Sequence, residues 1–122
     1  MVRKVLIVDD SASIREVVTM TLEGAGYEVI QAQDGQDALN KVDGQRVQLV
    51  ISDVNMPRMD GITFVENLKA LPHNRFTPVI MLTTESGEAR KQAGQAAGAK
   101  AWMVKPFQPD QMLDAVSKLV TP

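Results

Sequence analysis

The chain has 122 residues, of which 44% are hydrophobic and 23% charged, a composition typical of one globular domain. Its formal net charge of −2 gives no general attraction to nucleic acid or to an anionic membrane, so we expect neither as a partner. It contains no cysteine, which excludes disulfide bonds and thiolate zinc sites.

No targeting or membrane-spanning segment is recognisable. Only a short apolar stretch precedes Asp9, too short for a signal peptide, and no later run has the length of a membrane span. We therefore expect one cytoplasmic domain over residues 1–122, without an output domain.

Short apolar runs alternate with longer amphipathic segments. Most of the runs are continuous, as in strands that are covered on both faces. In the first helix, Ser13 and Glu16 have the spacing of a capping box, and Gly24 and Gly26 can end it. Five strands alternating with five helices predict an α/β fold, a doubly wound parallel sheet with helices on both faces. In chain order the expected elements are strand 5–8, helix 13–23, strand 27–32, helix 36–42, strand 49–51, helix 62–71, strand 79–82, helix 88–97, strand 101–104 and helix 109–120.

Polar side chains directly follow four of the five expected strands. In a sheet of this kind, ligands bind at the carboxyl ends of the strands, where the winding of the chain reverses. Three carboxylates, a hydroxyl and an ammonium group should therefore meet at one edge of the sheet: Asp9, Asp10, Asp53, Thr83 and Lys105.

This set of groups predicts metal-assisted phosphoryl chemistry. Three neighbouring carboxylates repel one another and need a counter-charge, and Mg²⁺ prefers oxygen ligands. A metal held by Asp9, Asp10 and Asp53 would leave an open side for a phosphoryl group, and Asp53 could act as the nucleophile, because carboxylates form aspartyl-phosphates. The metal and Lys105 would neutralise the phosphoryl oxygens, while the Thr83 hydroxyl donates a hydrogen bond to one of them.

From Lys4 to about Val120 the chain resembles the receiver domains of bacterial two-component response regulators, in particular stand-alone, CheY-like receivers. The matching motifs occur in the family's order: Val-Leu-Ile-Val-Asp-Asp at residues 5–10, Ser-Asp-Val-Asn-Met-Pro at residues 52–57 with Gly61, Leu-Thr-Thr at residues 82–84, and Val-Lys-Pro-Phe at residues 104–107. The resemblance implies a flavodoxin-like sheet with strand order 2-1-3-4-5, and it implies Mg²⁺ as the cofactor.

The resemblance also implies a role for each matching residue. It makes Asp53 the phosphoacceptor (4-aspartylphosphate), Thr83 the switch hydroxyl and Lys105 the phosphate-binding cation. It makes Asp9 and Asp10 metal ligands together with Asp53.

Further roles follow from the same resemblance. The backbone carbonyl of Asn55 would join the metal ligands, and the Asn55 and Glu85 side chains would tune the rate of dephosphorylation. The Lys105–Pro106 bond would be cis.

One residue departs from the family pattern. The switch aromatic is usually Tyr or Phe, and Trp102 stands at the matching position. Three interpretations stay open for Trp102: a rotating switch, a fixed part of a partner surface, or a core aromatic. The segment 88–99 is rich in Ala and Gly, so we expect a weakly anchored helix there that reorganises on phosphorylation.

The resemblance also suggests partners. The segment 75–78 and the pair Asn55 and Glu85 are chemotaxis-like, so we expect a monomer that is phosphorylated by a CheA-like histidine kinase and signals to a target protein, such as a flagellar motor switch. A type IV pilus motor or another phosphorelay stays open.

Three other functions are compatible with the same architecture. A hydrolase with an aspartyl nucleophile would usually carry its Asp-x-Asp motif after the first strand, whereas Asp9 and Asp10 are adjacent. A flavin-binding module would need a Ser/Thr/Gly-rich phosphate loop after that strand. A degenerate receiver would lack part of the acidic, hydroxyl and lysine set, which is complete here.

Overall fold

The computed structural model describes residues 3–83, 95 and 97–120. Five parallel strands form one sheet in the order β2-β1-β3-β4-β5, which confirms the expected topology. The expected helix at 88–97 lies largely outside the described residues, and a short 3₁₀ turn, η1, follows α3. The elements in chain order are β1 (Lys4–Val8), α1 (Ala12–Gly24), β2 (Glu28–Ala32), α2 (Gly35–Lys41), β3 (Leu49–Asp53), α3 (Gly61–Lys69), η1 (Pro72–Asn74), β4 (Val79–Thr83), β5 (Ala101–Val104) and α5 (Pro109–Leu119).

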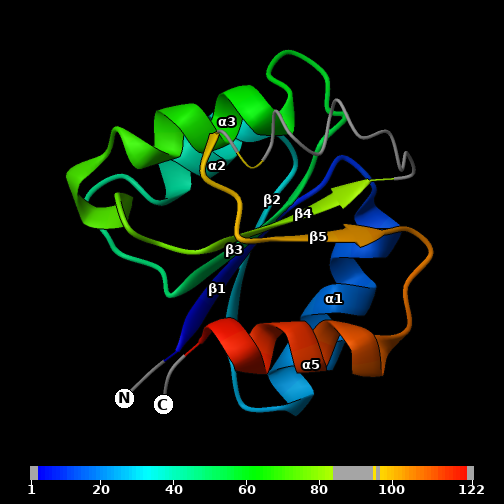
Figure 1. Ribbon diagram of the computed structural model, residues 1–122. Helices are drawn as coiled ribbons and strands as arrows, with labels where there is room; N and C mark the ends of the chain where they lie inside the picture. The colour runs from blue at the N-terminus through cyan, green and yellow to red at the C-terminus, as the bar shows by residue number, and fades with distance from the viewer. Residues whose placement is uncertain (1–2, 84–94, 96, 121–122) are drawn as a thin grey trace.

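The helices cover both faces of the sheet (Figure 1). Helices α1 and α5 lie on one face, and α2 and α3 lie on the other. Each face has its own hydrophobic cluster: Phe64 and Leu68 of α3 pack on the α2/α3 side, and Leu22 and Met112 pack on the α1/α5 side. Strands β3 and β4 are buried along their whole length, which explains their continuous apolar sequences.

The start of α1 differs from the sequence prediction. Ser11 is the N-cap: its backbone is extended and its hydroxyl accepts a hydrogen bond from the Ile14 N–H at 3.3 Å. The predicted capping box of Ser13 and Glu16 is therefore wrong, because both residues already lie inside the helix.

None of the helices in the described part of the chain has the length and hydropathy that crossing a membrane requires.

The strand order places the site. The winding reverses between β1 and β3, which are neighbours with Val8 opposite Ser52. Asp9 and Asp53 are the next residues of these two strands, so their side chains meet at the reversal point, where ligands bind in open α/β sheets.

Candidate phosphoacceptor and metal site

Asp9 and Asp53 are held in place by backbone interactions at the carboxyl end of the sheet. Asp9 is 0% exposed, its N–H donates to the Ala32 carbonyl, and its Oδ1 accepts a hydrogen bond from the Ser11 N–H at 2.9 Å. Asp53 is the last residue of β3 and is 6% exposed; its Oδ1 accepts a hydrogen bond from the Asn55 N–H at 3.3 Å. Both carboxylates are thus fixed and nearly desolvated.

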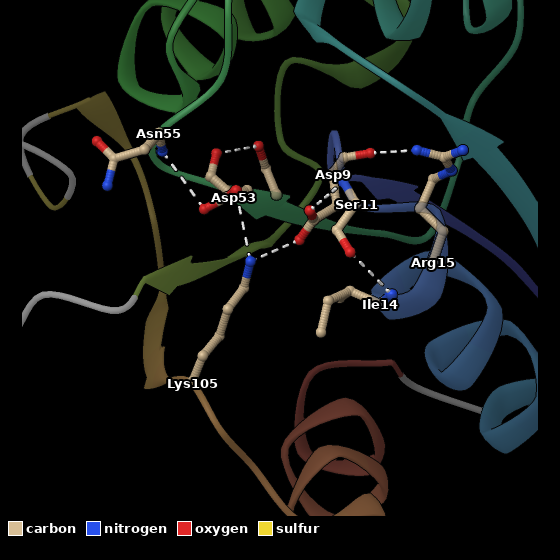
Figure 2. A network of polar contacts seen from close by, with 8 residues as sticks. Asp9, Ser11, Ile14, Arg15, Asp53, Asn55 and Lys105 are labelled. Carbon is tan, nitrogen blue, oxygen red and sulfur yellow. Dashed lines mark hydrogen bonds and ion pairs between the residues drawn. The ribbon is translucent and has the colours of Figure 1, made fainter.

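Lys105 provides the positive charge between these two acids. Figure 2 shows its side chain reaching the carboxylates of Asp9 and Asp53, with Nζ 2.8 Å from Asp9 Oδ2 and 3.4 Å from Asp53 Oδ2. The Lys105 N–H donates to the Thr83 carbonyl at 2.7 Å, which continues the pairing of β4 with β5. The Lys105–Pro106 peptide bond is cis, as predicted.

The three acids are close enough to share a cation. One carboxylate oxygen from each of Asp9, Asp10 and Asp53 lies within 4.8 Å of the others. Asp10 is exposed, so the cluster opens to solvent on its side. The donor set therefore fits a hard divalent cation, which binds through carboxylate oxygens and water.

Burial and neighbouring charges shift the ionisation of this cluster. Burial raises the pKa of Asp53, and the charge of Asp9 raises it further, more than Lys105 and the Asn55 N–H lower it. Burial alone would lower the pKa of Lys105, but the hydrogen bond and the charges supplied by Asp9 and Asp53 outweigh it, so this pKa is raised. The negative charge of Asp53 is therefore under-compensated, whereas Lys105 stays protonated.

A close backbone approach shapes the loop that leaves Asp53. A Cβ atom on Gly61 would lie 2.1 Å from the Asp53 carbonyl oxygen and 2.9 Å from the Val54 Cα, so only glycine fits there. The Gly61 N–H donates to the Val54 carbonyl at 2.8 Å. Asp60 caps α3 by accepting a hydrogen bond from the Thr63 N–H. The glycine of the expected motif thus turns the chain back tightly against the site.

The family model described as "Response regulator receiver domain" matches residues 5–117 of the chain. The chain belongs to this family. Receiver domains are signalling domains that accept a phosphoryl group from histidine kinases, which sets aside the hydrolase and flavin-module alternatives.

This receiver is similar to several differently named bacterial proteins. It is 41% identical to chemotaxis protein CheY1 of Helicobacter pylori over 110 residues, which are 87% of each chain. It is 35% identical to protein PilG of Pseudomonas aeruginosa over 93% of this chain and 84% of that protein. It is 38% identical to the transcriptional regulatory protein PhoP of Bacillus subtilis over 90% of this chain, but it spans only 45% of PhoP.

A solved structure agrees with this assignment. Vibrio cholerae chemotaxis protein CheY4 superposes on the receiver with a TM-score of 0.94 and 48% identity, covering 98% of this chain and 100% of that chain. These similarities support the CheY-like fold. PilG and PhoP also match this chain, so the similarities as a whole do not select one pathway.

The remaining predicted residues of the receiver differ in burial and in their position relative to the site. Thr83 is buried at the end of β4, one residue beyond Leu82, which lies opposite Asp53. The Asn55 side chain is exposed beside the site, and Glu85 lies outside the described residues. Trp102 is partly buried in β5 and packs against the hydrophobic cluster on the α2/α3 side. This packing agrees with the core interpretation of Trp102, and its role in switching stays a prediction.

Two residues beside the site were not predicted. Asp34 is almost fully buried and caps α2, and one of its oxygens lies 3.6 Å from the exposed Arg58 guanidinium. Arg58 has a φ of 69°, a left-handed conformation that is uncommon outside glycine. The Asp34-Gly35 pair before a helix is a recognisable cap signal, but nothing in the sequence indicates the φ of Arg58.

Proposed function

We propose that this receiver is a phosphoryl switch in which Asp53 accepts a phosphoryl group from a histidine kinase. A carboxylate oxygen of Asp53 attacks the phosphorus, and an acyl-phosphate bond forms. The P–N bond to the kinase's phosphohistidine breaks, and its electron pair stays on the imidazole, which is then free to take up a proton. The observation that carries this proposal is the position of Asp53, nearly buried among two further carboxylates and the Lys105 ammonium.

The proposed cofactor is Mg²⁺. Asp9, Asp10, Asp53 and the backbone carbonyl of Asn55 would hold it, and the bound ion would neutralise phosphoryl oxygens. The oxygen-only donor set within 4.8 Å supports this assignment for the three carboxylates.

Lys105 and Thr83 would hold the transferred group. The Lys105 ammonium lies 3.4 Å from Asp53 and would pair with a phosphoryl oxygen. The Thr83 hydroxyl would donate a hydrogen bond to another oxygen and so transmit phosphorylation to β4 and β5. We further propose that Asn55 and Glu85 tune the rate of dephosphorylation. Trp102 would belong to the surface that changes on phosphorylation.

We propose chemotaxis or a related motility pathway as the setting. The receiver would be phosphorylated by a CheA-like kinase and, as a monomer in the cytoplasm, bind a target such as a flagellar motor switch through its phosphorylated form. It would catalyse only its own phosphorylation and dephosphorylation. The similarity to CheY1 and CheY4 supports chemotaxis, whereas the similarity to the transcriptional regulatory protein PhoP supports the alternative of a different signalling pathway.

Intact-mass measurement with acetyl phosphate and Mg²⁺ tests the phosphoryl chemistry. We expect the mass to rise by one phosphoryl group, and we expect EDTA to prevent the rise. Asp60→Asn is the matched control: Asp60 is an exposed acid on the same loop, Asn also caps helices, and phosphoryl uptake should be unchanged. Uptake that persists without a divalent metal would contradict the proposed cofactor.

A further inference from the structure

An unusual surface lies at the opposite end of the sheet from Asp53. The turn η1 and the loop after it precede β4, so they lie where the strands begin (Figure 1). Phe76 in this loop is 86% exposed, the highest fraction among the large hydrophobic side chains of the described residues. Together with the exposed residues Arg46, His73 and Arg75 it forms what we call the basic-aromatic patch.

The loop that carries Phe76 is held by buried and partly buried hydrogen bonds. The Asn74 side chain is 0% exposed; its Oδ1 accepts from the Val47 N–H and its Nδ2 donates to the Gln45 carbonyl, each at 2.9 Å. The Thr77 hydroxyl donates to the Val47 carbonyl at 3.0 Å, and the Lys69 ammonium donates to the Thr77 carbonyl. These hydrogen bonds hold the loop on either side of Phe76 in place, which reduces the entropic cost of ordering the loop when a partner binds.

Within the described part of the chain, neither Arg46 nor Arg75 forms an ion pair with an acidic side chain, and the Arg75 guanidinium lies 5.6 Å from the centre of the Phe76 ring. A shallow depression of about 320 Å³ lies between Arg46, His73 and Phe76. Aromatic and arginine side chains around such a depression are typical of the residues that dominate binding energy at protein interfaces.

We propose that the basic-aromatic patch docks an acidic segment of a partner protein that carries one apolar side chain. The segment's carboxylates would pair with Arg46 and Arg75, and its apolar side chain would contact Phe76 in the depression. Charge complementarity favours an acidic occupant, and a single aromatic beside a small depression suits one side chain better than insertion into a lipid surface. The net charge of −2 disfavours a nucleic acid.

This docking is independent of the proposed phosphoryl switch. The patch and Asp53 lie at opposite ends of the strands, and no residue of the patch belongs to the acidic cluster. The Asp53→Asn variant should therefore bind the segment as tightly as the parent chain, so the two proposals fail separately.

Fluorescence anisotropy of a labelled peptide tests the proposal on the full chain. The probe is a 12-residue peptide of Asp and Glu around one central Leu. We expect saturable binding that weakens at least fivefold between 50 and 300 mM NaCl. Phe76→Ala should weaken binding at least tenfold, and the Arg46→Ala/Arg75→Ala double variant should weaken it at least fivefold. A peptide with Ser in place of Leu should bind at least fivefold more weakly.

Lys118→Ala is the matched control, because Lys118 is an exposed base on α5 that is paired with Asp114 outside the patch. This variant should bind the peptide like the parent chain. The ¹⁵N-resolved NMR shifts caused by the peptide should be confined to residues 45–47 and 72–77. Absence of binding, equal binding by Phe76→Ala, or shifts elsewhere would overturn the proposal. If the chain bound phosphatidylglycerol vesicles through Phe76 but did not bind the peptide, the proposed acidic segment would be wrong and the ligand of the patch would be a membrane surface.

Discussion

The two ends of the sheet both bury polar side chains, but they satisfy them differently. At the amino end, the Asn74 side chain and the Thr77 hydroxyl join the loops before β3 and β4 through hydrogen bonds between complementary donors and acceptors. At the carboxyl end, Asp9 and Asp53 are about as buried, yet both carboxylates are hydrogen-bond acceptors, and among the described residues the Lys105 ammonium is the one that lies between them.

This difference separates a structural polar network from a binding site. A buried hydrogen-bonded network stabilises the fold when every member has its partner. Clustered carboxylates with too little counter-charge instead destabilise the unliganded fold, and perturbed groups of this kind gather at functional sites. We therefore expect substitutions in the amino-end network to lower stability, and substitution of the phosphoacceptor carboxylate at the carboxyl end to remove function at little or no cost in stability.

The largest expected effect is the loss of phosphoryl uptake in Asp53→Asn. The amide has no carboxylate oxygen to form the acyl phosphate, so the mass rise with acetyl phosphate and Mg²⁺ should disappear. The free energy of unfolding should not fall, because the Lys105 ammonium keeps its 2.8 Å contact with Asp9. A persistent mass rise in this variant would place the acceptor on another residue. The carboxyl end of the sheet would then not be distinguished from the amino end by the phosphoacceptor.

The second effect is a loss of stability in Asn74→Ala. Removing this side chain leaves the buried Val47 N–H without its acceptor, so we expect a loss of about 2–3 kcal/mol in the free energy of unfolding by urea. Phosphoryl uptake should persist in the folded fraction.

Thr77→Ser is the control for this network. It keeps the hydroxyl that donates to the Val47 carbonyl and should lose no more than about 1 kcal/mol. If Asn74→Ala were as stable as the parent chain, the amino end would have no stabilising network.

Sequence reasoning predicted the fold and the acidic cluster for one physical reason. Continuous apolar runs identify strands that are covered on both faces, and a parallel sheet brings the residues after those strands to one edge. This rule alone brought together Asp9, Asp10, Asp53 and Lys105, which the structure places in contact or within 4.8 Å. The strand order did not follow from the residues; it came from the family resemblance.

Asp34 had a local cap signal that was overlooked, whereas three other missed features depend on geometry that has no local sequence signal. Choosing Ser11 rather than Ser13 as the cap depends on which of them has extended backbone. The bond between Asn74 and Val47 spans 27 positions, and nothing in the sequence pairs these two residues. The φ of 69° at Arg58 is a property of the folded loop that an arginine in the sequence does not indicate.

The third prediction concerns pH and the metal-free protein. Because the pKa of Asp53 is raised in the folded state, the folded chain binds more protons than the unfolded chain between the ordinary carboxyl pKa and the raised one. The Asp53 contribution is therefore fully favourable below the ordinary value and is lost as pH rises through the raised value.

In EDTA, Asp53→Asn should accordingly resist urea better than the parent chain at pH 7, and the difference should shrink towards pH 3. Asp60→Asn, which changes an exposed acid on the same loop, should show no such pH dependence. A parent chain that gains stability relative to Asp53→Asn as pH rises would mean that Lys105 fully compensates the cluster.

The smallest expected effect separates helix capping from the site at the carboxyl end. Ser11→Ala removes the hydroxyl that accepts the Ile14 N–H and should cost about 1 kcal/mol in urea unfolding. Ser13→Ala, inside α1, should change stability by less than about 0.5 kcal/mol. Neither variant should alter phosphoryl uptake, because the bond to Asp9 comes from the Ser11 backbone N–H, which alanine retains. If Ser11→Ala lost uptake but not stability, its hydroxyl would belong to the acidic site rather than to the helix.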